Sequence, residues 1–544
     1  MSENINELIS IVTRKSLSDA GIDASLYQDL CLDLPDDSRF GDLSTNIALR
    51  IAKQLKKSPR EIAGQIILHI KNNLPKSKCG KFIMDVKVEG AGFINFYLSH
   101  DYFCRQLKGI FRNKEKAIKV NFGLGKKVLV EFVSANPTGP LSVAHARQAA
   151  VGDALANILN FSGFRAKKEY YLNDEGNQIN ILGGSVALRL KELNGENVEF
   201  PENYYQGDYI YDIAKDLQKL SKLPADIGDF AGKYILDIIK KELTDFGVVF
   251  DIWYSQKALR EKGKIDKALN WLKKRGFLYQ QDGALWLRST QFGDDKDRVV
   301  IKSDGSYTYL APDIAYHQEK YRRGFKWLIN LWGPDHHGYI SRLKASVQAF
   351  GKDADSLSVI IVQLATIFRD GNPVQMSTRR GQYITLREVL DEVGRDAARF
   401  FFMMRKTSSH LDFDLAVAKK TTSENPVYYV QYAYARISSI LRSNPIKIKD
   451  ANLAVLKEKE ELDLIKKLLQ FSYIINICVK TQDPYMLTVY LQEVSETFHK
   501  FYDLHRVLGQ DPDLTNARLV LLDASKTVIA TGLKLLGVSL PDRM

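Results

Sequence analysis

Residues 128–159, which read VLVEFVSANPTGPLSVAHARQAAVGDALANIL, constrain the fold more than any other stretch of the chain. The stretch opens with an apolar, β-branched run, which is the composition of a buried strand. A loop rich in serine, asparagine, proline and glycine follows over residues 134–140. Apolar residues then recur at helical spacing up to Leu159. The pattern therefore predicts a strand, a polar loop and a helix in succession.

This succession is typical of a nucleotide-binding turn, because the N-terminus of a helix offers unpaired N–H groups and a partial positive charge to phosphate. His145 lies where the predicted helix begins. Many strand–loop–helix units bind nothing, so the residues alone leave open a surface histidine at a helix end.

Length and charge set broad limits. A chain of 544 residues exceeds one core, and domains of ~100–200 residues predict about three of them. The 77 basic and 65 acidic residues give a formal net charge of +12, which suits a polyanionic partner. The excess is spread along the sequence, so it does not by itself separate nucleic acid from a membrane surface.

Cysteine use and apolar runs indicate the compartment. The four cysteines are far apart and form no C-x-x-C pair, which favours a reducing cytosol over a disulfide framework or a zinc knuckle. The N-terminus has no signal-peptide pattern, and the longest apolar runs fall far short of the ~20 residues that cross a bilayer. We expect a soluble cytoplasmic protein with no membrane partner.

Three domains follow from the pattern of elements, with predicted bounds 1–112, 113–410 and 411–544. Residues 1–112 predict a small α+β domain with helices over 5–20, 43–55 and 58–71 and strands over 82–88 and 93–97. Residues 111–118 are interpreted as a charged linker.

The middle of the chain alternates strands and helices, which predicts an α/β domain with a Rossmann-type, doubly wound parallel sheet. Strands are expected over 128–133, 167–171, 298–302, 327–332 and 358–365. Residues 183–297 are helical and charged, with helices over 210–220, 230–243 and 265–274, and are interpreted as an insertion. Ligands of such a sheet lie at the carboxyl ends of its strands. From about residue 388 the chain is expected to be helical, which predicts an all-α C-terminal bundle.

Residues 135–145 resemble the first signature of class I aminoacyl-tRNA synthetases, and the lead-in SANPTGPL resembles the arginyl-tRNA synthetase form. The usual His-x-Gly-His is Ser142-Val143-Ala144-His145 here. The resemblance implies catalytic roles for His145, which would also bind ATP, and for Ser142 in place of the first histidine.

Residues 374–381, VQMSTRRG, combine arginines and hydroxyls that could close over a triphosphate, although a solvated basic turn is as good an interpretation. They resemble the family's second signature, Lys-Met-Ser-Lys. That resemblance implies ATP contacts from Gln375, Met376 and Ser377 and catalytic roles for Ser377, Thr378 and Arg379. Our hypothesis is that Arg379, Arg380 or Arg147 replaces the missing lysine charge.

Residues 304–317, DGSYTYLAPDIAYH, resemble the arginine pocket of the family. A guanidinium group needs carboxylates and an aromatic edge, which implies Asp313 and Glu131 as acidic partners and Tyr309 as the packing ring. Ser134 and Asn136 of the signature loop are the other substrate-binding candidates. From the residues alone, a helix-start carboxylate after Pro312 is the favoured interpretation of Asp313.

The turn at 333–338, GPDHHG, follows a predicted strand. Its Asp-His-His run could suggest a metal site, but no further ligand stands at a usual spacing. The resemblance instead implies ATP contacts from Gly333, Asp335, His336 and His337. No protein metal site is predicted, and Mg²⁺ is expected only with ATP.

The C-terminal domain has tyrosines beside arginines in NPVYYVQYAYAR and FHKFYDLHRVLG. Helical aromatics are usually core residues, although RNA loops are also read by stacking on such rings. The resemblance to the anticodon-binding domain implies tRNA contacts from Tyr429, Tyr432, Tyr502 and the terminal Met544.

The resemblance spans nearly the whole chain, including GDLSTN and GAGFINF of the N-terminal domain. It implies an arginyl-tRNA synthetase acting on ATP, L-arginine and tRNA(Arg), expected as a monomer. Two alternatives remain at this point: a catalytically decayed copy that only binds tRNA, and a nucleotidyl transferase for a small molecule.

Overall fold

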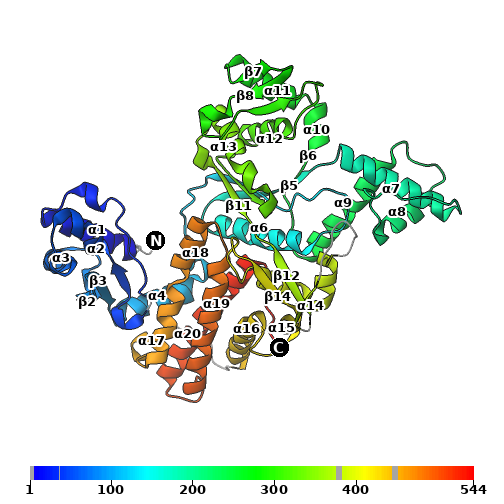
Figure 1. Ribbon diagram of the computed structural model, residues 1–544. Helices are drawn as coiled ribbons and strands as arrows, with labels where there is room; N and C mark the ends of the chain where they lie inside the picture. Colours follow the sequence, from blue (N-terminus) through cyan, green and yellow to red (C-terminus); the bar gives the residue numbers. More distant parts are fainter. Residues whose placement is uncertain (1–4, 36, 370, 375–382, 444–450) are drawn as a thin grey trace. The chain divides into compact units, whose positions relative to one another are not determined.

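The computed structural model describes residues 5–35, 37–369, 371–374, 383–443 and 451–544 (Figure 1). The chain divides into two compact units. One comprises Met1–Ile118, Arg436–Phe471 and Glu496–Val528, and the other comprises Lys119–Ala435, Ser472–Ser495 and Ile529–Met544. No helix of the described part is long and apolar enough to span a bilayer.

The N-terminal part of the first unit is an α+β module, as predicted. Its antiparallel sheet has the order β1 (Leu43–Thr45), β3 (Phe93–Leu98), β2 (Ile83–Glu89), and it is accompanied by α1 (Ile5–Asp19), α2 (Ile47–Leu55) and α3 (Pro59–Asn73). The predicted cap of α3 is present, because the Ser58 hydroxyl accepts a hydrogen bond from the Glu61 N–H and Pro59 begins the helix.

Two predictions for this region are wrong. The helix expected over 43–55 starts only at Ile47, because residues 43–45 pair with β3. Gly41, at φ +96°, lets the preceding turn approach that strand so closely that a Cβ would lie 2.9 Å from the Phe96 carbonyl oxygen. The linker expected over 111–118 is helical and belongs to α4 (His100–Asn113) and α5 (Glu115–Ile118).

The second unit is built on a five-stranded parallel sheet, which confirms the predicted doubly wound α/β fold. Its order is β11 (Leu357–Ile361), β10 (Trp327–Trp332), β4 (Lys127–Glu131), β5 (Arg165–Leu172), β6 (Ile252–Ser255). The chain adds strands on one side of β4 and then returns to add β10 and β11 on the other. The β4–β10 junction is therefore the topological switch point, where such sheets bind ligands.

The predicted strand–loop–helix is β4 followed by α6 (Val143–Phe161), which lies against the sheet (Figure 1). The helix is buried along most of its length because α14 covers it as well. At Gly152 a Cβ would lie 2.3 Å from the Phe132 ring, so only glycine allows this approach between helix and strand.

The predicted insertion over 183–297 is partly wrong. It contains the expected helical part, but β6 within it is an edge strand of the parallel sheet. The strand expected over 298–302 is β9 (Arg298–Ile301), which joins a separate antiparallel sheet with β7 (Leu278–Gln281) and β8 (Ala284–Leu287). Asp282 and Gly283 connect β7 and β8 with positive φ, a hairpin signal that the sequence carries. The helices of residues 177–274 are α7 (Asn177–Leu193), α8 (Asp208–Gln218), α9 (Ile227–Asp245), α10 (Gln256–Glu261) and α11 (Lys264–Lys274).

The rest of the chain is mainly helical, as predicted. The exception is a small sheet of order β13 (Asn372–Pro373), β12 (Ala365–Arg369), β14 (Leu411–Asp414), in which buried Leu411 and Phe413 alternate with more exposed aspartates. The helices are α12 (Leu310–Arg322), α13 (Ile340–Ala349), α14 (Leu386–Phe402), α15 (Leu415–Lys419), α16 (Pro426–Ser443), α17 (Lys459–Leu469), α18 (Phe471–Thr481), α19 (Tyr485–Leu504) and α20 (Pro512–Leu536).

Candidate active site

The first-signature residues form the N-terminal cap of α6. Ser142 is the N-cap residue, and His145 folds back on it with Nδ1 3.2 Å from the Ser142 N and 3.1 Å from the Ser142 Oγ. Because the Ser142 N–H can only donate, His145 Nδ1 is the acceptor. A neutral ring then carries its proton on Nε2, so His145 offers an N–H donor there.

The charge state of His145 follows from its surroundings. Burial lowers its pKa to about 4, and the negative charge of Asp335 opposes this only in part. His145 is therefore neutral near pH 7 and acts as a hydrogen-bond donor without a positive charge. Ser142, which stands where the family has a histidine, orients this ring.

The loop after β4 is strained and firmly held. Val133 and Ser134 both lie in the left-handed region, at φ 67° and 42°. The Ser134 hydroxyl donates to Glu131 Oε1 at 3.3 Å and accepts from the Tyr171 N–H at 3.1 Å. Asn136 donates its side-chain amide to Gln178 Oε1 at 2.5 Å. The substrate-binding candidates of this loop are therefore fixed by β4, β5 and α7.

Asp313 lies in the first turn of α12, where its Oδ2 accepts a hydrogen bond from the Tyr339 hydroxyl at 2.7 Å. Burial is the main cause that raises the pKa of Asp313, to a net value of about 7; nearby Glu131 also raises it, while the Tyr339 hydrogen bond and Lys320 lower it. Tyr309 immediately precedes the helix, and its side chain is 86% exposed. The structure therefore does not pack Tyr309 against Asp313 as one helical face.

The turn after β10 lies beside α6 at the switch point. A Cβ on Gly333 would approach Asp335 Oδ1 to 2.6 Å and Gln148 Nε2 of α6 to 3.9 Å. Asp335, His336 and His337 are exposed, and His336 Nε2 lies 3.3 Å from Asp335 Oδ2. Within the described ranges, no group of three or more histidine, cysteine or acidic side chains is arranged to hold a metal ion.

The hypothesis that Arg147 supplies a cation to phosphate is wrong. Its side chain is buried, and its guanidinium donates to the carbonyl oxygens of Gln363 at 2.7 Å, Ser409 at 3.0 Å and Lys406 at 3.0 Å. It also donates to the Leu364 carbonyl at 3.3 Å, so the guanidinium is committed to four backbone carbonyls and holds together the segments before β12 and β14.

The second-signature candidates, Gln375, Met376, Ser377, Thr378, Arg379 and Arg380, lie outside the described residues. The chain that follows them returns to the first signature: the Leu386 N–H donates to the Leu141 carbonyl at 2.7 Å, and the Val143 N–H donates to the Ile384 carbonyl at 3.3 Å. Both signatures therefore lead to the start of α6.

The predicted RNA-contacting tyrosines are half-buried. On α16, the ring of Tyr432 stacks on that of Tyr428 with centroids 6.1 Å apart, and Tyr429 lies one turn before it. On α19, Tyr502 has the Arg436 guanidinium 4.2 Å from its ring centroid. Met544 is 49% exposed. Half-buried rings are compatible with both a core role and base stacking.

Two features were missed from the sequence. One is a set of buried polar side chains on α12, Tyr316, His317 and Lys320, whose helical spacing from Asp313 could have indicated them. The other is Tyr339, whose position in a turn gave no signal.

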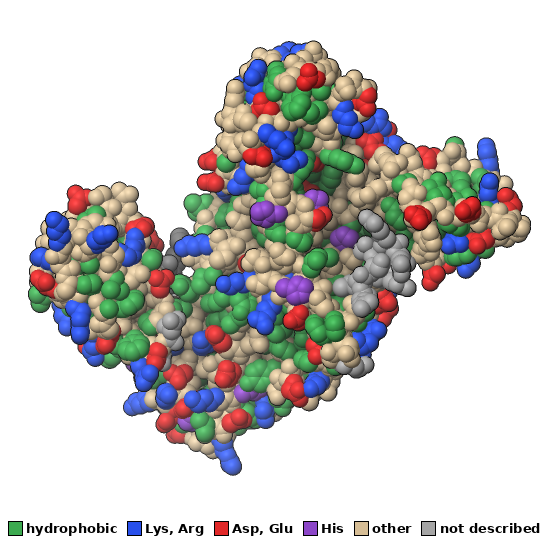
Figure 2. Space-filling view, viewed as in Figure 1, with side chains coloured by type: hydrophobic (Ala, Val, Ile, Leu, Met, Phe, Trp, Pro, Cys, Tyr) green, Lys and Arg blue, Asp and Glu red, His purple; other side chains and the backbone are tan. Residues whose placement is uncertain are grey.

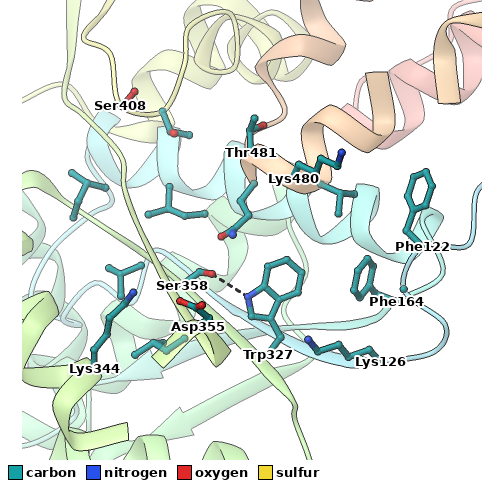
Figure 3. Close-up of a pocket in the computed structure, with 18 of the residues that line it drawn as sticks. Phe122, Lys126, Phe164, Trp327, Lys344, Asp355, Ser358, Ser408, Lys480 and Thr481 are labelled. Carbon is teal, nitrogen blue, oxygen red and sulfur yellow. Dashed lines mark hydrogen bonds between the residues drawn. The ribbon is translucent and has the colours of Figure 1, made fainter. Parts of the chain in front are cut away.

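A groove of about 1190 Å³ runs along the edge strand β11 (Figure 3). Trp327 lies in it and donates a hydrogen bond to the Ser358 hydroxyl at 3.0 Å, with Lys126, Lys344 and Lys480 around it. None of the predicted site residues lines this groove.

The parallel sheet with its switch point between β4 and β10 is the catalytic fold of a class I aminoacyl-tRNA synthetase. Residues 106–421 match the family model described as tRNA synthetases class I (R), catalytic domain. Residues 5–98 match the arginyl tRNA synthetase N terminal domain, and residues 430–544 match the DALR anticodon binding domain. The chain belongs to the arginyl-tRNA synthetase family.

Relatives and solved structures agree with this assignment. The arginine–tRNA ligase of Citrifermentans bemidjiense is 46% identical over 526 residues, which cover 94% of each chain. The crystal structure of the putative arginyl-tRNA synthetase from Campylobacter jejuni is 36% identical, covers 82% of this chain and 100% of its own, and has a TM-score of 0.76. The arginyl-tRNA synthetase of Thermus thermophilus, at 21% identity, shares the fold with a TM-score of 0.80 over 99% of this chain and 100% of its own.

Proposed function

We propose that the switch point between β4 and β10 is where this chain ligates L-arginine to tRNA(Arg) at the expense of ATP. In the first step an arginine carboxylate oxygen bonds to the α-phosphorus, the bond to the bridging oxygen breaks, and pyrophosphate leaves. In the second, a hydroxyl of the terminal adenosine of tRNA attacks the arginyl carbonyl, and AMP leaves. Both steps move charge on phosphate oxygens, which positioned donors stabilise.

The observation that carries the proposal is the Ser142–His145 cap. It presents the His145 Nε2–H at the N-terminus of α6, where the partial positive charge of the helix end favours an anion. Gly333, Asp335, His336 and His337 of the neighbouring turn are proposed to contact the nucleotide. Mg²⁺ is proposed to arrive with ATP without a dedicated protein site.

Asp313 is proposed to take the guanidinium group of arginine, and Asn136 the ammonium or carboxylate group. Ser134 holds the loop between them. Tyr309, which is exposed here, is proposed to fold over the aliphatic part of bound arginine.

The second-signature segment, residues 374–381, is proposed to complete the phosphate site, with Gln375, Met376 and Ser377 on ATP and with Arg379 or Arg380 as the cation. With Arg147 occupied, these two arginines are the remaining candidates of our hypothesis. Arg379→Ala and Arg380→Ala should each be assayed for arginylation. If neither slows the reaction beyond about tenfold, this part of the proposal is wrong.

Recognition of tRNA is proposed to use Tyr429, Tyr432, Tyr502 and Met544 for the anticodon, together with the N-terminal domain. The bounds 1–112, 113–410 and 411–544 also stay proposals, as do a monomeric state and a cytoplasmic location.

The test is an arginylation assay with purified protein, ATP, arginine and a tRNA(Arg) transcript. We expect arginine-dependent charging and no charging with lysine. Tight tRNA binding without charging would favour the decayed copy, and turnover on a small molecule without tRNA would favour the nucleotidyl transferase.

A further inference from the structure

Two buried glutamates lie side by side in the middle of the parallel sheet. Glu131 of β4 and Glu169 of β5 are register partners, and their residues are 6% and 0% exposed. Register partners in a sheet point to the same face, so the two carboxylates share one side. Two unpaired carboxylates there would carry a large desolvation cost.

The helix α12 and the turn after it supply one cation to each glutamate. Lys320 Nζ donates to Glu131 Oε2 and, at 3.1 Å, to Asn330 Oδ1. Arg323 donates to both oxygens of Glu169, with Nη2 2.9 Å from Oε1. Each pair is therefore neutral on its own.

Of the two ion pairs, Lys320–Glu131 is the one whose glutamate side chain also bonds to the signature loop, residues 134–140. The other oxygen of Glu131 accepts the Ser134 hydroxyl at 3.3 Å. Ser134 and the preceding Val133 both have left-handed backbone. The remaining side-chain partner of Glu169 is instead the Tyr316 hydroxyl, at 2.6 Å. The Lys320–Glu131 pair thus lies directly beneath the strained turn.

A chain of hydrogen bonds also connects Lys320 to the arginine-binding end of α12. Asn330, which accepts from Lys320, donates its Nδ2 to His317 Nε2 at 2.9 Å. His317 Nδ1 then donates to the carbonyl oxygen of Asp313 at 2.8 Å. Along this series of hydrogen bonds, Asn330 and His317 each accept a hydrogen bond from the residue before and donate one to the residue after. Asp313, His317 and Lys320 occupy one face of the helix.

We propose that Lys320 is the positioning residue of the arginine slot. It neutralises Glu131, which then holds the Val133–Ser134 turn, and through Asn330 and His317 it fixes the turn of α12 that carries Asp313. Glu131 is accordingly a support for the slot, and Asp313 is the carboxylate left to pair with the guanidinium group. This inference rests on the proposed function of the site.

The test compares Lys320→Gln, Glu131→Gln and the double variant by calorimetric titration with arginine and by arginylation kinetics. Each single change leaves one buried charge without its partner, which is costly in a protein interior. We expect each to raise the arginine dissociation constant at least about tenfold, with the KM for ATP within about threefold of the original value. The double variant has a neutral amide pair, and its arginine affinity should return to within about threefold of the original protein.

The neighbouring pair provides a matched control. Arg323→Gln with Glu169→Gln also converts a buried ion pair into amides, but the described side-chain hydrogen bonds of this pair run to Tyr316 and not to the signature loop. The Tyr316 ring lies 4.3 Å from Lys320 Nζ, so the control also tests whether any disturbance beside Lys320 is enough. We expect it to change the melting temperature while leaving the arginine dissociation constant within about threefold.

Several results would overturn the inference. If the double variant binds arginine no better than Glu131→Gln alone, Glu131 contacts the substrate directly. Single variants with unchanged arginine affinity, or a control double variant that is equally impaired, would exclude a specific role for Lys320. If the single variants fail to fold, the double variant still tests the inference: recovered arginine binding would support it, and lost arginine binding would contradict it. An original protein that charges no tRNA would instead contradict the proposed function.

Discussion

At the scale of residues, the first signature of this chain keeps one histidine as a neutral hydrogen-bond donor. The Ser142 N–H fixes Nδ1 of His145 as an acceptor, and burial keeps the ring neutral. The donor that we propose for phosphate is therefore oriented by a helix cap, an arrangement that serine supports as a preferred N-cap residue. The loss of the first histidine changes how the second is held and leaves its donor in place.

Replacing His145 tests this description. His145→Ala should lower kcat for arginylation by about 10²–10³, the usual effect of removing one transition-state donor. Ser142→Ala keeps the backbone N–H and should cost about tenfold or less, while Ser142→Thr, which can still cap, should stay near the original rate. Steady-state kinetics with saturating tRNA would measure all three. Equal losses in Ser142→Ala and His145→Ala would mean that the serine hydroxyl itself contacts phosphate.

Asp313 makes arginine binding depend on pH. Its pKa, raised by burial to about 7, means that the carboxyl carries a proton below that pH and must lose it to pair with a guanidinium group. We expect the KM for arginine to rise as the pH falls from 8 to 6, with protons released on binding. The KM for ATP should stay flat because His145, with a pKa of about 4, remains neutral throughout. A flat KM for arginine over this range would show that Asp313 is ionised in the free protein.

The same shift has a stability consequence of known sign. A carboxyl whose folded-state pKa lies above its unfolded value favours the protonated native state. Its stabilising effect is complete below the unfolded value of 3.8 and is lost as the pH rises towards 7.

At the scale of elements, Arg399 joins α14 to its neighbours. Its side chain is 0% exposed, and it binds Asp153 of α6 at 2.5 Å, the Leu536 carbonyl at the end of α20 at 2.9 Å and the Phe246 carbonyl at 3.2 Å. The helix that follows the second signature is thereby fixed to the helix that carries the first.

Loss of this arginine should destabilise the unit. Arg399→Met leaves Asp153 with one cation fewer in a buried place, and we expect the free energy of unfolding to fall by about 3–5 kcal/mol. Arg395→Met is the matched control, since that exposed side chain makes one bond to the Gly537 carbonyl and should cost about 1 kcal/mol or less. Urea denaturation would compare them. Equal values for the two variants would contradict a central role for Arg399.

The sequence was a good guide to elements with a strong local period. β4, α6, β5 and β10 have clear apolar patterns, and their positions were predicted to within a few residues. Residues 43–45 and 298–301 were misassigned because their pairing partners, β3 and β8, are distant or lie in another sheet. Whether such a short segment forms a strand depends on the strand that it pairs with, and the local sequence pattern does not show that partner.

The same distinction between local motifs and distant partners applies to the candidate site. His145 and Asp313 could be proposed from the sequence because a motif marks each of them, and their roles stay predictions. Lys320 and Asn330 were missed because a buried lysine gains meaning only from the carboxylate that it meets, and Glu131 lies 189 positions away. The hypothesis for Arg147 was wrong for a similar reason, since its four carbonyl partners come from segments more than 200 residues downstream.

At the scale of the whole molecule, the charge excess is distributed. Basic and acidic side chains are intermixed over the face shown in Figure 2, so no single basic patch dominates it. A net charge of +12 nevertheless favours approach of a polyanion such as tRNA.

This charge predicts a difference between the substrates in their response to salt. Because phosphate contacts release counterions, the KM for tRNA(Arg) should rise at least about tenfold between ~50 and ~200 mM salt. The KM for arginine should change by less than about threefold, since a buried ion pair is screened much less than surface charge. Arginylation at several potassium chloride concentrations would measure both. A KM for tRNA that ignores salt would indicate recognition mainly through uncharged contacts.

Asp313, the residue proposed to select arginine, lies in the first turn of α12, and Lys320 of the same helix neutralises a glutamate in the middle of the sheet. Changing α12 so that the domain accepts a neutral mimic of arginine, such as citrulline, would therefore also disturb the contacts of that helix with the parallel sheet. Diversification is better directed at Tyr339, which reaches Asp313 from outside α12 and can be exchanged while that helix keeps its own contacts.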